Sequence, residues 1–191
     1  MSHTVVVYHS GYGHTQKQAV AVQQGAASPA GASAELVAIS ADGELPADAW
    51  EKLEAATAIV FGTPTYMGGP SWQFKRFADA SSKPWFAAKW KNKIAAGFTN
   101  SASMNGDKLS TLHYLFTLAM QHGMVWVGTG MMPANSKAAQ RNDVNWLGAY
   151  AGAMAQSPAD SSPDDGPLPG DLETARLFGQ RVAETALRWK G

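Results

Sequence analysis

The stretch TVVVYHSGYGHT, residues 4–15, decides the fold of this chain. Its first half is a continuous, mostly β-branched run, which is typical of a strand buried on both faces of a sheet. Two glycines end that run, and apolar residues then recur at helical spacing at Ala19, Val22 and Ala26. A buried strand that turns directly into a helix begins a βαβ unit, so these residues predict an α/β protein.

The same alternation continues along the chain. We expect further strands at residues 34–40, 57–64, 93–99 and 124–128, and helices at 45–56, from 70 onward, at 109–122 and at 171–190. Strands that alternate with helices require right-handed crossovers and form a parallel sheet covered on both faces. The sequence therefore predicts a three-layered, doubly wound fold in one domain, residues 1–191, with a long proline-rich loop at about 128–170.

The last two helices have distinctive faces. Asp171 is placed to cap the final helix. That helix should press a face of small residues against the sheet: Ala175, Gly179, Val182 and Ala186. The helix before it carries one apolar stripe, made of Leu109, Leu112, Phe116 and Met120.

Composition excludes several functional classes. Lys plus Arg and Asp plus Glu number 15 each, and this neutrality argues against a nucleic-acid binder, which needs a basic face. The chain has no cysteine, which excludes disulfides and thiolate chemistry. The first residues do not resemble a signal peptide, and no window approaches the roughly 18 apolar residues of a membrane helix. The histidines lack metal-binding spacing. We expect a soluble, cytoplasmic protein without a metal.

The loop at residues 10–15 should follow the carboxyl end of the first strand, where open parallel sheets bind ligands. It lacks the lysine of a triphosphate P-loop, and Gln16 breaks the glycine pattern of a dinucleotide loop. The hydroxyls of Ser10 and Thr15, with backbone N–H groups at a helix N-terminus, suit a single phosphate. The alternative is that Ser10 or Thr15 merely caps the helix.

Two further loops should lie at the same edge of the sheet. The segment GTPTYMGGP, residues 62–70, offers hydroxyls and a flat or soft apolar surface at Tyr66 and Met67. The segment TNSASMNGD, residues 99–107, offers side chains suited to the edge of a polar heterocycle. Each loop alone could be an ordinary polar turn. Together with the first loop they predict a phosphate site beside a planar ring.

The chain shows no catalytic machinery of its own. No G-x-S-x-G elbow occurs, and Asp107 is the one acid in the three loops. Without a nucleophile or paired carboxylates, the difficult chemistry would come from a cofactor that the protein orients.

At this point the motifs resemble a known family. S-x-Y-G-H-T at residues 10–15, G-T-P-T-Y at 62–66 and H-G-M at 122–124 are similar to those of flavodoxin-like flavoproteins. They look most like the WrbA-type NAD(P)H:quinone oxidoreductases and their FMN-reductase relatives. The resemblance spans nearly the whole chain and implies a five-stranded sheet in the order 2-1-3-4-5, with FMN bound at the strand ends.

The resemblance also implies roles for particular residues. The phosphate loop falls on Ser10, Gly11, Tyr12, Gly13, His14 and Thr15, and the second flavin loop on Pro64, Thr65, Tyr66 and Met67. The third loop runs over residues 99–106 and includes Thr99, Asn100, Ser101, Ala102 and Ser103. The active-site tryptophan would be Trp85, and His122 would lie near the outer face of the flavin.

Some segments depart from the family pattern. WrbA proteins have Arg-Phe where this chain has Tyr66 and Met67, their third loop is rich in glycine, and their late loop carries a G-G-D-G-S pattern that is missing here. The segment between the second and third expected strands is also shorter.

The expected function is transfer of two electrons from NADH or NADPH through FMN to a quinone, by a homodimer or homotetramer. One alternative is a flavodoxin-type electron carrier, against whose acidic surface the zero net charge argues. The other is a scaffold that no longer binds flavin.

Overall fold

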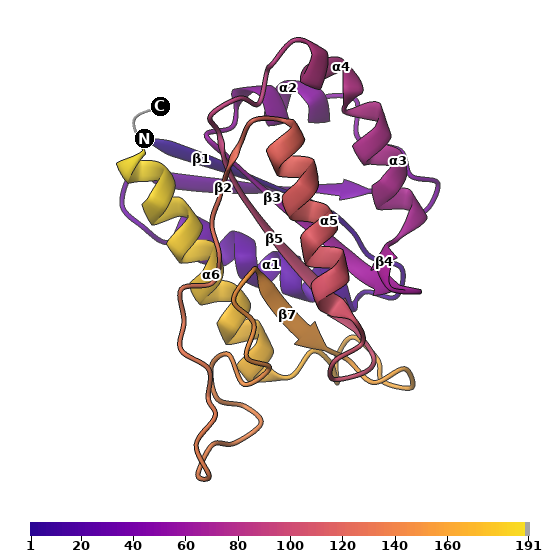
Figure 1. The fold of residues 1–191 in the computed structure, drawn as a ribbon, viewed down its shortest axis with the longest axis vertical. Helices are drawn as coiled ribbons and strands as arrows, with labels where there is room; N and C mark the ends of the chain where they lie inside the picture. Colours follow the sequence, from indigo (N-terminus) through magenta and orange to yellow (C-terminus); the bar gives the residue numbers. More distant parts are fainter. Residues whose placement is uncertain (190–191) are drawn as a thin grey trace.

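The computed structural model describes residues 1–189 and has the expected α/β architecture, a mostly parallel sheet between two layers of helices (Figure 1). The strands are β1 (Ser2–His9), β2 (Ala32–Ile39), β3 (Ala58–Tyr66), β4 (Gly69–Pro70), β5 (Ile94–Ser101), β6 (Val125–Trp126) and β7 (Ala153–Gln156). They follow the order β2-β1-β3-β5-β6, with β4 antiparallel to β3 and β7 parallel to β5. This arrangement confirms the predicted fold class.

Alternation along β1 explains the two layers. Val5 and Val7 join the core under α2 (Ala49–Ala55), α3 (Trp72–Ala80) and α5 (Lys108–Gln121). Val6 and Tyr8 join the core under α1 (His14–Ala27) and α6 (Pro169–Arg188). Successive residues of a strand point to opposite faces, so one continuous apolar run supplies both cores.

The strand position beside β5 is filled by two short strands instead of the one that the sequence predicted. One strand was expected at residues 124–128, but β6 pairs only with the start of β5, and β7 pairs with its end. Between them the chain leaves the sheet, and the excursion closes where the Thr129 N–H donates to the Tyr150 carbonyl at 2.9 Å. The expected loop at 128–170 therefore contains a strand that completes the sheet.

Several helix details also differ. Helix α2 begins at Ala49, four residues later than expected. On α5 only Leu112 of the expected stripe is buried; Leu109, Phe116 and Met120 are exposed, because the buried face is rotated toward Leu115 and Ala119. Asp171 lies in the first turn of α6 but does not cap it.

Helices α1 and α6 cross at unusually close range. A Cβ added at Gly25 of α1 would overlap the Arg176 carbonyl oxygen, and one added at Gly179 of α6 would overlap the Val22 carbonyl oxygen. Gly179 was expected to face the sheet, and it faces α1 instead. The two glycines let the helix backbones touch.

Within residues 1–189, none of the helices combines the length and the apolar character needed to cross a membrane.

Candidate functional site

A cavity of about 600 Å³ opens at the carboxyl ends of β1, β3 and β5. Its size is ordinary for a small-molecule site. It is lined by Tyr12, His14, Thr15, Pro64, Thr65, Tyr66, Asn100, Ser101, Ala102, Ser157, Pro158, Ala159, Ser161 and Pro163. The structure thus brings the three loops singled out in the sequence to one place and adds a fourth segment, residues 157–163, that follows β7.

The first loop is built around the Ser10 hydroxyl. It accepts hydrogen bonds from the backbone N–H groups of Gly13 and Gln16, each at 3.1 Å. Gly13 has a φ of 89°, in the left-handed region that favours glycine. The N–H groups of His14 and Thr15 belong to the first turn of α1 and have no acceptor within the helix. Ser10 therefore shapes the loop, and two helix donors are left for a ligand.

The late segment packs on the start of α1. The His14 Nε2 lies 3.1 Å from the Ser161 carbonyl oxygen, and Lys17 pairs with Asp164 at 3.0 Å. A Cβ on Gly13 would come within 2.6 Å of Pro163 Cγ. Residues 161–164 thus cover the helix end beside the first loop. Sequence reasoning missed this wall, because its only signal was a cluster of Ser, Pro and Asp.

The hydroxyls of the second and third loops bind each other. Thr65 donates to Thr111 at 2.8 Å, and the hydroxyls of Thr65 and Thr99 are also 2.8 Å apart, so Thr99 must be the donor to Thr65. All three are buried. This chain of hydroxyls ties the ends of β3 and β5 to α5. The Thr99 hydroxyl therefore has a structural role.

Asn100 and Ser101 face the cavity from the third loop. The Ser157 hydroxyl donates to Asn100 Oδ1 at 3.1 Å, which leaves the Asn100 amide N–H₂ as a donor for a ligand. The Ser101 hydroxyl donates to the Ser103 carbonyl at 3.1 Å. Thr99 and Ser103 therefore support the wall, and Asn100, Ser101 and Ala102 form it.

Two exposed tyrosines stand at the mouth of the cavity. The rings of Tyr12 and Tyr66 meet edge to face with centroids 6.4 Å apart. The Tyr66 hydroxyl lies 2.6 Å from where a Cβ on Gly11 would be, so this glycine allows the ring to lie across the loop. Burial raises the pKa of Tyr66. Met67 is fully exposed and is not among the residues that line the cavity. The mouth offers flat aromatic surface to a planar molecule.

The structure does not bring Trp85 and His122 to this cavity. Trp85 lies in α4 (Ser82–Phe86), and its indole N–H donates to the Gln121 carbonyl at 2.9 Å. His122 follows the last residue of α5, stacked on Trp90 at 4.2 Å and hydrogen-bonded to Ser81 at 2.9 Å. Helix α5 begins beside the cavity and runs back along the sheet for 14 residues, about 21 Å. Both residues therefore lie at the opposite end of the sheet.

Buried His122 should make stability depend on pH. Burial lowers the pKa of His122 to about 4, from 6.5 in an unfolded chain. Between these values the unfolded chain takes up a proton that the folded protein does not, so the free energy of unfolding should fall as pH decreases from 6.5 to 4. We expect His122 to account for a loss on the order of 3 kcal/mol. Urea titrations across this range should show a weaker pH dependence for His122→Gln.

Exposed His113, on the same helix, provides the control. His113→Gln should keep the wild-type pH dependence. An identical slope for His122→Gln and the wild type would contradict the prediction.

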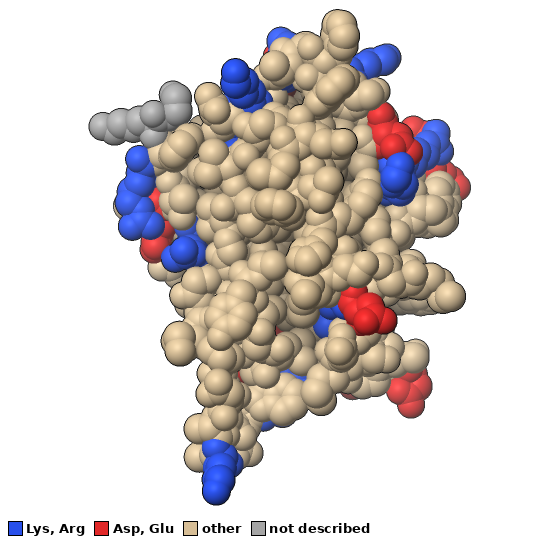
Figure 2. All heavy atoms as spheres, viewed as in Figure 1, with Lys and Arg blue, Asp and Glu red and all other residues tan. Residues whose placement is uncertain are grey.

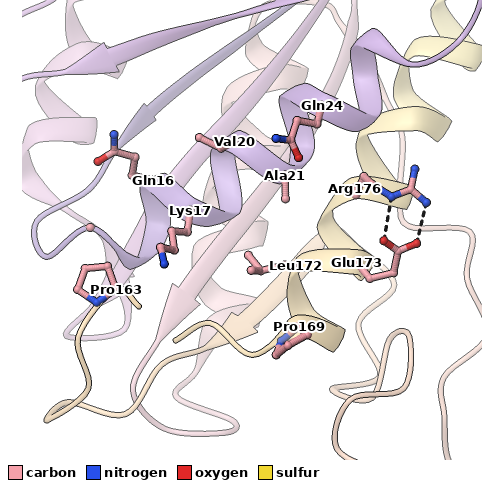
Figure 3. Close-up of a pocket in the computed structure, with 11 residues that line it drawn as sticks. Gln16, Lys17, Val20, Ala21, Gln24, Pro163, Pro169, Leu172, Glu173 and Arg176 are labelled. Atoms are coloured by element: carbon pink, nitrogen blue, oxygen red, sulfur yellow. Dashed lines mark hydrogen bonds and ion pairs between the residues drawn. The ribbon is translucent and has the colours of Figure 1, made fainter. Parts of the chain in front are cut away.

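A larger cavity of about 690 Å³ lies between α1 and α6, on the far side of Pro163 (Figure 3). Its wall is mainly hydrocarbon from Val20, Ala21 and Leu172, with the ion pair of Arg176 and Glu173 at one end (Figure 3). From the strand-end loops it is lined by Gly13, and from the late segment by Pro163. The hydrogen-bonding groups for a polar ligand are concentrated in the 600 Å³ cavity.

Comparisons with known proteins identify the family of the chain. Residues 13–139 match the family described as NADPH-dependent FMN reductase. The chain is 51% identical over 183 residues to "Flavodoxin FldP" of Pseudomonas aeruginosa (strain UCBPP-PA14), with 96% of each chain covered. It is 32% identical over 206 residues to an "NAD(P)H dehydrogenase (quinone)" of Geotalea uraniireducens (strain Rf4), covering 96% of this chain and 97% of the relative.

Among solved structures, the "flavodoxin, WrbA-like protein from Agrobacterium tumefaciens" matches with a TM-score of 0.80, 55% identity and full coverage of both chains. A flavodoxin from the domain Archaea matches with a TM-score of 0.66 and 17% identity, which bears on the fold alone.

Proposed function

The chain belongs to the NADPH-dependent FMN reductase family, among its WrbA-type flavodoxin-like members, and on that premise we propose that it is an NAD(P)H:quinone oxidoreductase. Its cofactor is FMN, which when bound would supply the transfer of two electrons from NAD(P)H to an acceptor. The protein's task is to bind and orient the reactants. The 600 Å³ cavity is the proposed site.

The residues present fit FMN. The free N–H groups of His14 and Thr15, at the positive end of α1, would hold the phosphate with the Thr15 hydroxyl. The Asn100 amide and the backbone at Ser101 and Ala102 would bond the polar edge of the ring. The loop from Pro64 to Tyr66 would cover one face of the ring, and residues 157–163 would exclude water.

The uncharged lining of the cavity is the observation that favours a quinone as the electron acceptor. None of the residues that line the cavity is acidic or carries a fixed charge, and the tyrosines at its mouth are exposed. Neutral aromatic surface suits a flat, uncharged acceptor. Figure 2 shows the same character on a wider scale, since most of the face in view is uncharged and its charged side chains lie mainly along the edges.

A second candidate, an electron carrier that serves protein partners, is favoured by the 51% identity to a protein named as a flavodoxin. Steady-state oxidation of NADH and NADPH with a soluble benzoquinone separates the two. The proposed enzyme should turn over with at least one nucleotide, with FMN bound and visible by absorption. FMN-loaded protein without such turnover would contradict the enzyme and support the carrier. Protein that binds no FMN would contradict both.

The phosphate site predicts the effect of Ser10→Ala combined with Thr15→Ala. The double variant loses the hydroxyl that holds the N–H groups of Gly13 and Gln16, and with it the loop shape. We expect FMN affinity to fall at least about tenfold, equivalent to roughly 1.4 kcal/mol. Fluorescence titration with FMN measures this. The matched control is Ser33→Ala with Thr57→Ala, at the opposite end of the sheet, and unchanged affinity in the loop variant would refute the phosphate assignment.

We also propose that the chain forms a homodimer or homotetramer. Trp85 and Phe86 of α4 are both exposed and form an apolar surface suited to a second copy. In such an assembly Trp85 would reach a cavity only if that cavity belonged to a neighbouring copy. Light scattering of the purified protein tests the assembly.

A further inference from the structure

Lys108 is a buried cation directly behind the third loop. It is the first residue of α5, and its side chain has no exposed surface. Its ammonium donates hydrogen bonds to the Ser101 hydroxyl at 2.9 Å and to the Ser103 carbonyl at 2.6 Å. Lysine is almost never fully buried unless it is paired. Both of its hydrogen-bond partners are neutral groups of the third loop.

The positive charge of Lys108 lacks a direct counter-charge. Throughout residues 1–189, none of the carboxylates forms an ion pair with it. The negative charge of Asp171 raises the pKa of Lys108, but Asp171 is already held by both terminal guanidinium nitrogens of Arg141, at 2.8 and 2.7 Å. The start of α5 adds the positive end of a helix dipole. Burial lowers the pKa of Lys108 to about 8, which still leaves it mostly protonated at neutral pH.

The cation is coupled tightly to the cavity wall. Ser101 lines the cavity and accepts from Lys108 on its other side. The neighbouring Ala102 carbonyl accepts from the Gln156 side chain at 3.1 Å, so β7 holds the same loop. The wall therefore has little freedom to move away from the charge behind it.

We propose that Lys108 makes the cavity bind the reduced flavin ring more tightly than the oxidised ring. The inference rests on the proposed binding of FMN. When NAD(P)H gives up a hydride it becomes NAD(P)⁺, and the ring that accepts the hydride gains two electrons and one proton, hence one negative charge. A fully buried cation behind the wall stabilises that charge more than it would in water. Lys108 is thus a positioning residue that also sets the reduction potential.

The test is the midpoint potential of bound FMN together with the dissociation constant of oxidised FMN. Lys108→Gln keeps a hydrogen-bond donor for Ser101 and Ser103 but removes the charge. Its preference for reduced over oxidised FMN should fall at least tenfold, which lowers the two-electron potential by about 30 mV. Lys108→Arg keeps the charge and should stay near the wild-type potential. Lys108→Met repeats the charge removal in case the glutamine variant folds poorly, with folding checked by circular dichroism.

Lys93→Met is the matched control. Lys93 is also partly buried and donates to backbone carbonyls, those of Glu54 and Ala56, but it precedes β5 and so lies at the opposite end of the same strand. Its removal changes the net charge equally and should leave the potential unchanged. Equal loss of affinity for oxidised and reduced FMN in Lys108→Gln, with an unchanged potential, would show a purely structural role and overturn the inference. Equal shifts in the Lys93 and Lys108 variants would also overturn it. A wild-type protein without FMN would instead contradict the proposed function.

Discussion

Replacing Gly25 with alanine is expected to lower the free energy of unfolding by more than about 3 kcal/mol, or to prevent folding altogether. The added Cβ would overlap the Arg176 carbonyl oxygen and lie 3.0 Å from the Gln180 backbone nitrogen. These atoms belong to the backbone of α6, which cannot turn aside as a side chain can. To make room, α1 and α6 would have to separate, and the core beneath them would lose its packing.

Urea denaturation followed by circular dichroism measures this loss. Gly179→Ala, which inserts a Cβ into the same crossing from the other helix, should be similarly damaging. Gly69→Ala is the control, because a Cβ there meets no atom within 4 Å and the backbone is not in the left-handed region. It should change stability by less than about 0.5 kcal/mol. If Gly25→Ala unfolded at the wild-type urea concentration, the close crossing would be refuted.

Asp171→Ala is the second change with a large expected effect. Asp171 is only 3 % exposed; its carboxylate binds the guanidinium of Arg141 and also accepts the backbone N–H of Gln156 at 2.9 Å. Removing it leaves the Arg141 guanidinium, which is 23% exposed, over the Trp146 ring without a carboxylate partner, a loss of about 3 kcal/mol. Because Gln156 in turn holds the Ala102 carbonyl, FMN affinity should fall together with stability.

Denaturation and FMN titration of the same preparation measure both effects. Glu173→Ala offers the comparison, since Glu173 lies on the same helix and pairs with Arg176 near the surface. Exposed pairs contribute about 0–1 kcal/mol, so this variant should remain close to the wild type in stability. A stable Asp171→Ala protein with normal FMN affinity would mean that the buried pair does not support the cavity wall.

Much of the fold could be predicted because its signals are local. The runs that became β1, β3 and β5 have continuous apolar centres, β2 is apolar apart from Ser33 and Glu35, and glycine or proline marks several of their ends. The fifth strand position could not be predicted in the same way. It is filled by two segments separated by 26 residues, and the pairing of Ala153 with Phe98 depends on how the intervening chain folds back.

The candidate site could likewise be predicted only in part from the sequence. The loops after β1, β3 and β5 could be predicted to meet, because parallel strands end at one edge of a sheet. The wall at 157–163 could not, since it follows a strand that was not recognised. The family resemblance predicted that Trp85 and His122 would lie at the flavin site. Both instead lie beside the C-terminal end of α5, which runs away from the cavity of the same chain. Lys108 follows a polar turn and looks like a solvated lysine; only the packed structure reveals its burial.

The excursion between β6 and β7 has a consequence for how this chain tolerates changes in length. Its two ends are already joined, because Thr129 bonds to the carbonyls of both Ala149 and Tyr150. In Figure 1 the orange segment between them projects beyond the body of the molecule. Extending a loop whose ends are fixed adds only about 0.6 kcal/mol for each doubling of its length. A peptide tag or a small domain grafted at the tip would therefore leave both halves of the edge strand in register, and would leave the cavity wall that follows β7 in place.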